Sequence, residues 1–152
     1  MNTPHSLSRR RLRTWIRLLR ITRRTENHLR EFLRVNYDTT LPRFDVAAAL
    51  YRAGKPIKMS ELSQMLLVSN GNATTVVDRL EKDGLAARKP SKNDKRVALV
   101  SLTAAGQEWF KDLAAAHEAE ISTLFADLGH DDLTVIRDMM RRLEGEPDEQ
   151  DV

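Results

Sequence analysis

The segment from Leu66 to Gly84, LLVSNGNATTVVDRLEKDG, constrains the fold more than any other stretch of the chain. Its apolar residues recur at steps of three and four, which is the spacing of one face of a helix. The opposite face carries small hydrogen-bonding side chains where surface helices usually carry lysine and glutamate. Ser69 is suited to cap the first turn, and Gly84 is suited to end the helix because glycine adopts a positive φ at little cost. The sequence therefore predicts a turn at residues 68–69 followed by a helix with a polar exposed face.

A charged loop follows between two strand-like segments, residues 86–89 and 97–101. Inward and outward positions alternate in the second segment, which favours a strand, and residues 90–95 favour a turn. Arg96 would stand near the tip of this hairpin, with Asp94 placed to hold its guanidinium in a bidentate pair. An arginine in such a position can enter a narrow minor groove of DNA, where the negative potential is enhanced.

A helix, a turn, a polar-faced helix and a charged hairpin in this order predict a winged helix–turn–helix that binds double-stranded DNA. The major groove admits one helix, and asparagine and threonine side chains complement its base edges. Polar groups at the start of a helix also bind phosphate, and lysines in the hairpin would add salt-dependent phosphate contacts. Gly71 either leaves space for a phosphate or a base, or is a weak start to the helix. The predicted DNA contacts are Ser69, Asn70, Gly71, Asn72, Thr74, Thr75, Arg79, Lys92, Asp94, Lys95 and Arg96.

Long helices are predicted on both sides of this region. Residues 7–36 carry an apolar stripe and a row of arginines, and the row is either a solvated face or a contact for phosphates or an acidic ligand. Part of the apolar stripe is expected to meet a second subunit, because a small domain cannot bury so long a helix alone. Residues 103–143 give two further helices that are separated at Gly129, and the acidic residues 144–152 are expected to be disordered.

The predicted fold class is therefore mostly α with a small β-wing, in a single unit of residues 1–152. Residues 40–102 form the winged helix–turn–helix, and residues 7–36 and 103–143 form a helical dimerisation lobe. Thr40 is predicted to cap a helix that ends at Gly54, with Pro42 in its first turn. Gly106 lies inside a predicted helix, where glycine costs about 1 kcal/mol relative to alanine. A close approach of another backbone segment is the expected compensation.

The charges are distributed unevenly along the chain. Residues 1–100 hold 21 Lys and Arg against 9 Asp and Glu, whereas residues 101–152 hold 4 against 13. The basic first part favours a polyanion partner, although solvated helix faces explain the same counts. There is no cysteine, which excludes disulfides and thiolate metal sites. No apolar run approaches the roughly 20 residues that span a bilayer, and no signal peptide is evident, so a cytoplasmic protein without a membrane partner is expected.

No catalytic pattern is evident in the sequence. The histidines are scattered, and the His117-Glu118 pair is not followed by the second histidine of a zinc-protease motif. Glycine-rich phosphate loops and the Gly-x-Ser-x-Gly motif are also absent. We therefore expect neither an enzyme nor a metal site nor a cofactor. Two other functions stay open, namely a winged helix used for protein–protein contact and a DNA-binding protein without a small-molecule effector.

The stretch from Leu62 to Gly106 contains Val68-Ser69, VDRLE at 77–81, Gly84-Leu85, Arg88, Asp94-Lys95-Arg96 and LTAAG at 102–106. With these motifs it resembles the MarR family of bacterial transcription regulators. The resemblance extends to the outer helices and covers about residues 9–143. It implies a homodimer whose outer helices form the dimer lobe and whose winged helices bind an inverted repeat, with Arg96 in the minor groove. Lys58 departs from the threonine or serine that often caps the third helix.

A narrower resemblance concerns the effector. The segments TLPRFD at 40–45 and VSNGN at 68–72 are similar to a subgroup associated with catabolism of aromatic acids, some members of which respond to aryl-CoA thioesters such as hydroxycinnamoyl-CoA. This implies a repressor released by a small aromatic ligand, either an aryl-CoA thioester or a free aromatic carboxylate. Arginines would suit the phosphates of CoA, whereas the two histidines are also explained as packed or surface side chains. The predicted ligand contacts are Trp15, Arg20, His28, Arg43, Phe44 and His117.

Overall fold

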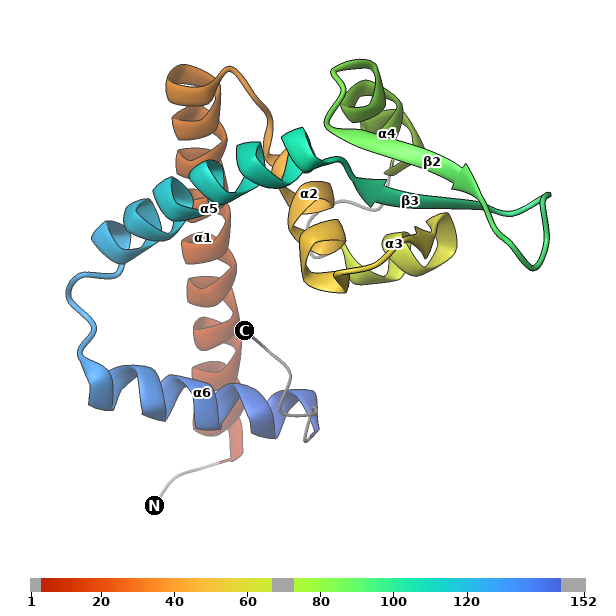
Figure 1. Cartoon of the computed structure of the whole chain (residues 1–152). Coiled ribbons are helices and arrows are strands. Elements are labelled where there is room, and N and C mark those ends of the chain that lie inside the picture. Colours follow the sequence, from red (N-terminus) through yellow and green to blue (C-terminus); the bar gives the residue numbers. More distant parts are fainter. Residues whose placement is uncertain (1–3, 67–72, 146–152) are drawn as a thin grey trace. The chain divides into compact units, whose positions relative to one another are not determined.

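The structure is a computed structural model that describes residues 4–66 and 73–145. Within these ranges it contains six α-helices and a three-stranded antiparallel sheet (Figure 1). The predicted fold class, mostly α with a small β-wing, is confirmed. The chain divides into two compact units, Met1–Glu118 and Ala119–Val152. In the described part of the chain, no helix combines the length and apolarity that crossing a membrane requires.

Helix α1 spans Pro4–Tyr37 and has 34 residues, a length of about 50 Å. It begins before the predicted residue 7, because proline suits the first helical position, where its missing N–H leaves no hydrogen bond unmade. Leu29 and Leu33, in its C-terminal half, are buried. Large apolar side chains of its N-terminal half are instead 42 to 58% exposed, namely Leu12, Trp15, Ile16, Leu18 and Ile21.

Helix α2 spans Leu41–Ala53, and both of its ends are as predicted. Thr40 is the N-cap, and its hydroxyl accepts a hydrogen bond from the backbone N–H of Arg43 at 3.3 Å. Gly54 follows the last turn with a φ of 65°, a conformation that glycine adopts without strain. The buried residues of α2 are Leu41, Phe44, Val46, Ala47, Ala49 and Leu50.

Two shorter helices follow, α3 at Met59–Met65 and α4 at Ala73–Lys82. The N-cap of α3 is Lys58, whose side chain makes no capping hydrogen bond, as expected from its departure from the family pattern. The sheet has the strand order β1-β3-β2, and Figure 1 shows β2 and β3 as one long hairpin. The strands are β1 at Ile57–Lys58, β2 at Ala86–Pro90 and β3 at Ala98–Leu102.

Helix α5 spans Ala104–Leu124 and begins at a tight joint with the end of α4. Thr103 donates its hydroxyl to the carbonyl of Gly84 at 2.7 Å and its backbone N–H to the carbonyl of Leu85 at 3.0 Å. Gly106 lies so close to Leu85 that a Cβ at residue 106 would stand 1.9 Å from the Leu85 carbonyl oxygen. The close backbone approach expected at Gly106 is therefore confirmed.

The core of the first unit is mainly aliphatic, and most of the unit's helices and strands contribute to it. Its largest fully buried side chains come from α1, α2, α3, α4, β3 and α5, so each of these elements packs into one core. An aliphatic core agrees with the low aromatic content of the sequence, 5%. These side chains are Leu33, Val46, Leu62, Val77, Leu80, Val100 and Leu113.

The second unit contains the end of α5 and helix α6, His130–Glu144. At the start of α6 the Asp132 carboxylate accepts a hydrogen bond from the backbone N–H of Gly129 at 3.0 Å. All residues of α6 are described, and none of them is buried. Glu144 is the last residue of α6, so the tail that the sequence predicts to be disordered from residue 144 does not begin there. Residues 146–152 lie outside the described residues. The large apolar side chains that α6 exposes are Leu133, Val135, Met139, Met140 and Leu143.

Candidate nucleic-acid interface and neighbouring pocket

Helix α4 has the polar exposed face that the sequence predicts. Its buried residues, Ala73, Val77 and Leu80, repeat at helical spacing, so the residues between them point away from the core. Thr74, Thr75 and Arg79 are exposed on this helix. Four other predicted DNA contacts lie outside the described residues, namely Ser69, Asn70, Gly71 and Asn72.

Arg88 connects the hairpin to helix α4. From strand β2 its guanidinium reaches the carboxylates of Asp78 at 2.7 Å and Glu81 at 3.2 Å, both on α4. The backbone N–H of Arg88 also donates to Glu81 at 2.9 Å. The Arg88 side chain is only 24% exposed, so these charge-assisted bonds are partly shielded from water and stronger than open surface pairs. Helix and hairpin are thereby held at a fixed angle.

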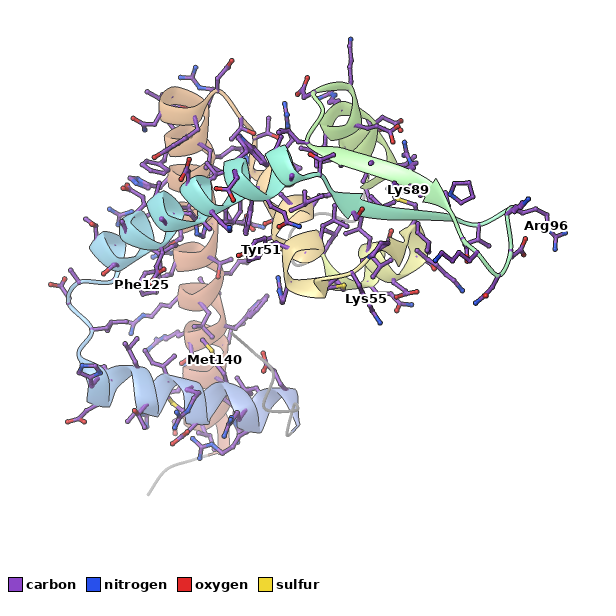
Figure 2. The ribbon with its side chains drawn as sticks, viewed as in Figure 1. Tyr51, Lys55, Lys89, Arg96, Phe125 and Met140 are labelled. Atoms are coloured by element: carbon purple, nitrogen blue, oxygen red, sulfur yellow. The ribbon has the colours of Figure 1, made fainter. Side chains whose placement is uncertain are left out.

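Arg96 extends from the loop between β2 and β3, as Figure 2 shows. Its side chain is 91% exposed, yet its orientation is restrained by Asp94. The Asp94 carboxylate accepts bonds from the Arg96 Nε at 3.2 Å and Nη2 at 3.4 Å, and from the Arg96 backbone N–H at 3.0 Å. These hydrogen bonds hold the pKa of Asp94 below its usual value. The pairing of Asp94 with Arg96 that the sequence predicts is present, and Lys92 and Lys95 are exposed beside it.

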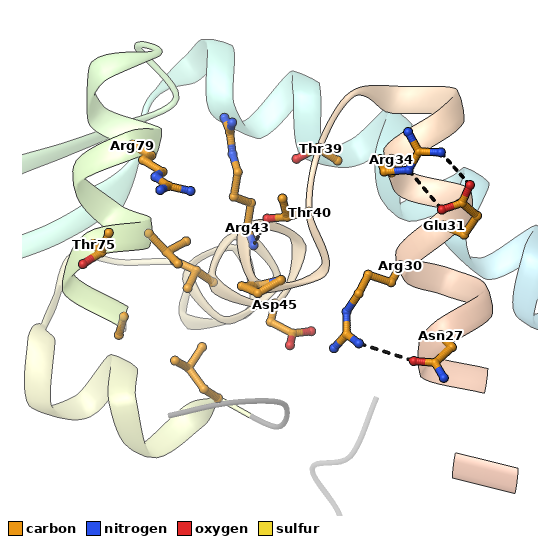
Figure 3. A pocket seen from close by; sticks show the side chains of 15 residues that line it. Asn27, Arg30, Glu31, Arg34, Thr39, Thr40, Arg43, Asp45, Thr75 and Arg79 are labelled. Carbon is orange, nitrogen blue, oxygen red and sulfur yellow. Dashed lines mark hydrogen bonds and ion pairs between the residues drawn. The ribbon is translucent and has the colours of Figure 1, made fainter. Parts of the chain in front are cut away.

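A pocket of about 540 Å³ lies between α1, α2 and α4 (Figure 3). Four arginines contribute to its lining: Arg30 and Arg34 from α1, Arg43 from α2 and Arg79 from α4. Arg34 is paired with Glu31 at 2.6 Å, and Arg43 with Asp83 at 2.5 Å, so these two are held in place by carboxylates. Thr75 and Arg79, both predicted DNA contacts, belong to the α4 wall of the pocket. Its apolar lining residues are Pro42, Val46, Leu66, Ala73 and Val76.

The structure does not gather the predicted ligand contacts at one place. Arg43 lines the pocket, whereas the aromatic ring of Phe44 is buried and stacks on the His117 ring at a centroid distance of 4.2 Å. Burial lowers the pKa of His117, which favours the neutral imidazole. Trp15 is 58% exposed on the N-terminal half of α1. Arg20 and His28 are exposed on the same helix and do not line the pocket.

The carboxyl group of Asp45, on α2, is partly shielded from water. Burial raises its pKa to about 6, with a further increase from Glu26 on α1 and a decrease from Arg52 on α2. The carboxyl of an unfolded chain titrates near 3.8. Ionising Asp45 therefore costs folding free energy, and this cost is absent below pH 4, grows as the pH rises to about 6 and is constant above it.

Replacing Asp45 with asparagine is accordingly expected to stabilise the chain at neutral pH. The gain should be about 2 kcal/mol at pH 7.5, because each pKa unit corresponds to about 1.4 kcal/mol and solvent reduces the full value. It should vanish towards pH 4. Urea unfolding of both proteins at equal chain concentration, between pH 4.5 and 7.5, measures this. A gain that is equal at every pH would contradict the assignment to ionisation.

The exposed polar face of α4 and the arginine-tipped hairpin, fixed to each other by Arg88, define a winged helix–turn–helix DNA-binding protein. The sequence model of the MarR family matches residues 37–97, the part of the chain that runs from α2 to the hairpin. The HTH-type transcriptional regulator MhqR of Bacillus subtilis is 26% identical over 137 residues, which cover 90% of this chain and 93% of MhqR.

Solved structures agree with these sequence matches. A MarR family transcriptional regulator from Silicibacter pomeroyi is similar with a TM-score of 0.78 and 27% identity, over 91% of this chain and 95% of its own. A mutant MarR of Escherichia coli, solved in complex with operator DNA, is similar with a TM-score of 0.71 and 27% identity, over 84% of this chain and 91% of its own. Residues 37–97 thus match the MarR family, and the relatives named here are transcriptional regulators.

The sequence did not predict the roles of three residues in the DNA interface and the pocket. Arg88 was singled out only as part of a family motif, although Glu81 seven residues earlier offers an opposite charge at the end of the preceding helix. Thr39 and Asp45 line the pocket and were not predicted as ligand contacts. Asp45 carries a sequence signal, since a carboxylate among the apolar residues of an amphipathic helix is unusual. No sequence signal distinguishes Thr39 from other loop threonines.

Proposed function

We propose that the chain is a cytoplasmic, ligand-responsive repressor. It binds an inverted-repeat operator as a homodimer, and a small aromatic anion in the pocket between α1, α2 and α4 releases it. An aryl-CoA thioester and a free aromatic carboxylate are the two forms of this ligand. Arginines in the lining suit either form, because a guanidinium binds carboxylate and phosphate oxygens in bidentate geometry.

The observation that carries the proposal is the double role of helix α4. Its exposed residues Thr75 and Arg79 belong both to the face expected on DNA and to the wall of the pocket. A molecule that enters the pocket therefore touches the helix that would lie in the major groove. The pocket also offers apolar surface from Val46, Leu66 and Val76, against which an aromatic ring can pack.

Exposed apolar faces support the homodimer. Trp15 on α1 is 58% exposed and Leu143 on α6 is 81% exposed, and each belongs to a row of large apolar side chains on its helix. Rows of this kind on a single chain mark a protein–protein contact. Two copies of the winged helix–turn–helix would then bind two half-sites about one helical turn of DNA apart.

The expected mechanism is a shift between two populations of the dimer. A ligand changes DNA affinity only as far as it binds the DNA-competent state and the other state unequally. Coupling free energies between two sites are typically about 1–3 kcal/mol, so a bound ligand is expected to weaken operator binding by about 5- to 150-fold.

The test uses the purified chain and DNA from the region beside its own gene. Footprinting is expected to reveal a two-fold symmetric site, and sedimentation of the complex is expected to give two chains per site. Hydroxycinnamoyl-CoA and benzoyl-CoA are then added to the complex, with the free acids and CoA alone as controls. Arg30→Ala is expected to lose the response to the ligand and keep the DNA affinity, because Arg30 lies on the α1 wall of the pocket. Arg23→Ala, an exposed arginine of α1 outside the lining, is the matched control.

The possible results separate the alternatives. Release by a free acid but by no thioester would replace the CoA form with the carboxylate form. DNA binding that no aromatic anion weakens would indicate a regulator without a small-molecule effector. Failure to bind any DNA from this region would favour a winged helix used for protein–protein contact.

A further inference from the structure

The N-terminal half of helix α1 concentrates positive charge that neither the proposed operator contacts nor the pocket uses. Residues 9–24 contain eight arginines, no lysine and no acidic residue. Four of the arginines recur at steps of four, three and four, so they project from one face of the helix along about 16 Å of its length. This arginine row consists of Arg13, Arg17, Arg20 and Arg24, and all four residues are exposed.

The arginine row has no counter-charge within residues 4–66 and 73–145. None of its side chains takes part in an ion pair or a hydrogen bond there. Arg34 at the other end of α1, by contrast, pairs with Glu31 at 2.6 Å. Like charges three or four residues apart on a helix repel each other. The row therefore costs helix stability in the free chain, and a polyanion bound from outside would offset that cost.

The arginine row points away from the apolar face of α1. At 3.6 residues per turn, Trp15 and Leu19 project from roughly the opposite side of the helix. Trp15 is 58% exposed and belongs to the face that a second copy covers in the proposed homodimer. A contact on that face leaves the arginine row open to solvent. The row is therefore available to a partner other than the second subunit.

The residue type and the spacing fit phosphate. All ten Lys or Arg positions of α1 are arginine, the side chain whose planar fork binds phosphate oxygens in bidentate geometry. Over the length of the row, one strand of duplex DNA presents about five phosphates, so the two charge densities are similar. The row also belongs to the same compact unit as α4 and the hairpin, the elements that define the DNA-binding protein.

We propose that the arginine row is a second DNA-binding surface, which holds the phosphate backbone of double-stranded DNA without reading its sequence. The inference rests on the DNA binding of the proposed function, but it requires neither an operator nor a small-molecule ligand. Phosphate contacts add affinity for every sequence and make binding steeply dependent on salt. The row thus raises affinity for operator and non-operator DNA alike, whereas the contacts proposed for α4 and the hairpin distinguish the two.

The test measures the affinity of the full chain for a labelled non-operator duplex across a series of salt concentrations. The row variant combines Arg13→Gln, Arg17→Gln, Arg20→Gln and Arg24→Gln, and glutamine has a helix propensity close to that of arginine. The slope of log K against log salt concentration is expected to become shallower by about 3 to 4, because each phosphate contact contributes about 0.9. Affinities for operator and non-operator DNA are expected to fall by similar factors.

A control variant removes the same number of positive charges from exposed positions on α5 and α6. It combines Lys111→Gln, Arg137→Gln, Arg141→Gln and Arg142→Gln, and its slope is expected to stay within about one phosphate contact of the wild-type value. Two half variants, Arg13→Gln with Arg17→Gln and Arg20→Gln with Arg24→Gln, are each expected to give about half of the full change. They decide the question even if the fourfold variant does not fold.

Three results would overturn this assignment. An unchanged slope in the row and half variants would leave the row as a solvated face. An equal change in the control variant would mean that net charge, and not the row, sets the slope. Unchanged DNA binding together with lost binding to phosphatidylglycerol vesicles would assign the row to lipid headgroups. Circular dichroism and sedimentation of each variant establish that fold and oligomeric state are kept. The proposed function is read separately, from the preference for operator DNA and from release by the ligand.

Discussion

Replacing Arg96 with alanine is expected to weaken operator binding by about 5- to 150-fold, the effect of losing about 1–3 kcal/mol at a groove contact. The Arg96 side chain is 91% exposed and its recorded polar contacts are with Asp94 in the same loop. Its removal therefore takes nothing from the core, and the free energy of unfolding should stay the same. The residue's position at the hairpin tip fits insertion into a narrow minor groove, where an arginine gains most from the enhanced negative potential.

Fluorescence anisotropy with labelled operator at one fixed salt concentration measures the effect. Lys111→Ala also removes one positive charge from an exposed position, on α5 beside Glu108, and is expected to leave DNA affinity within about twofold. Asp94→Ala should lower the affinity for operator DNA by an intermediate factor, because Arg96 is still present but is no longer oriented by a carboxylate. Equal affinities of the wild-type protein and Arg96→Ala would remove the hairpin from the DNA interface.

Replacing Gly106 with alanine is expected to destabilise the chain by about 3 kcal/mol or more, at the upper end of what overpacking costs. The added Cβ would stand 1.9 Å from the carbonyl oxygen of Leu85 and 2.8 Å from its carbonyl carbon. Both atoms belong to the backbone, and the oxygen also accepts the hydrogen bond from the Thr103 N–H, so this carbonyl group cannot move without disturbing the joint between α4, β2 and α5. Urea unfolding of the wild-type protein and the variant, at equal chain concentration, measures the difference in their free energies of unfolding.

Gly129→Ala serves as the control for the change of residue type. Its Cβ would meet only the Asp132 carboxylate oxygen, at an ordinary 3.8 Å. A loss of about 1 kcal/mol is expected there, because glycine is preferred to alanine at an N-cap but no backbone clash arises. If the two variants lost equal stability, the close approach at Leu85 would not be the cause.

Local rules account for what the sequence predicted correctly. The Thr40 cap, the Gly54 terminator and the Asp94–Arg96 pair each depend on residues within three positions of one another. The close contact at Gly106 was also predictable, because glycine inside a helix is costly without a reason. Binary patterns of apolar residues gave the order of the helices and strands, with boundaries shifted by a few residues at α1 and α6.

The pocket depends on distances that a sequence pattern does not contain. Its lining brings Asn27 of α1 together with Arg79 of α4, and Arg43 pairs with Asp83, which lies 40 residues later. Whether Thr39 is buried with its hydroxyl unpaired is decided by how α1, α2 and α4 pack, and no local rule fixes that. The predicted contacts Phe44 and His117 instead stack on each other, because two flat rings on neighbouring helices gain more from packing than from exposure.

The ion pairs of Arg88 have a consequence for the length of an operator half-site. Because the strand that carries the hairpin is fastened to Asp78 and Glu81 of α4, the separation between a contact made by that helix and one made by Arg96 is set within each chain. For an operator of the proposed kind, the number of base pairs between the major-groove and minor-groove contacts of one half-site is then constant. In such an operator the spacing between half-sites would be set by the dimer, whereas an inserted base pair within a half-site would displace one of the two contacts of a single chain.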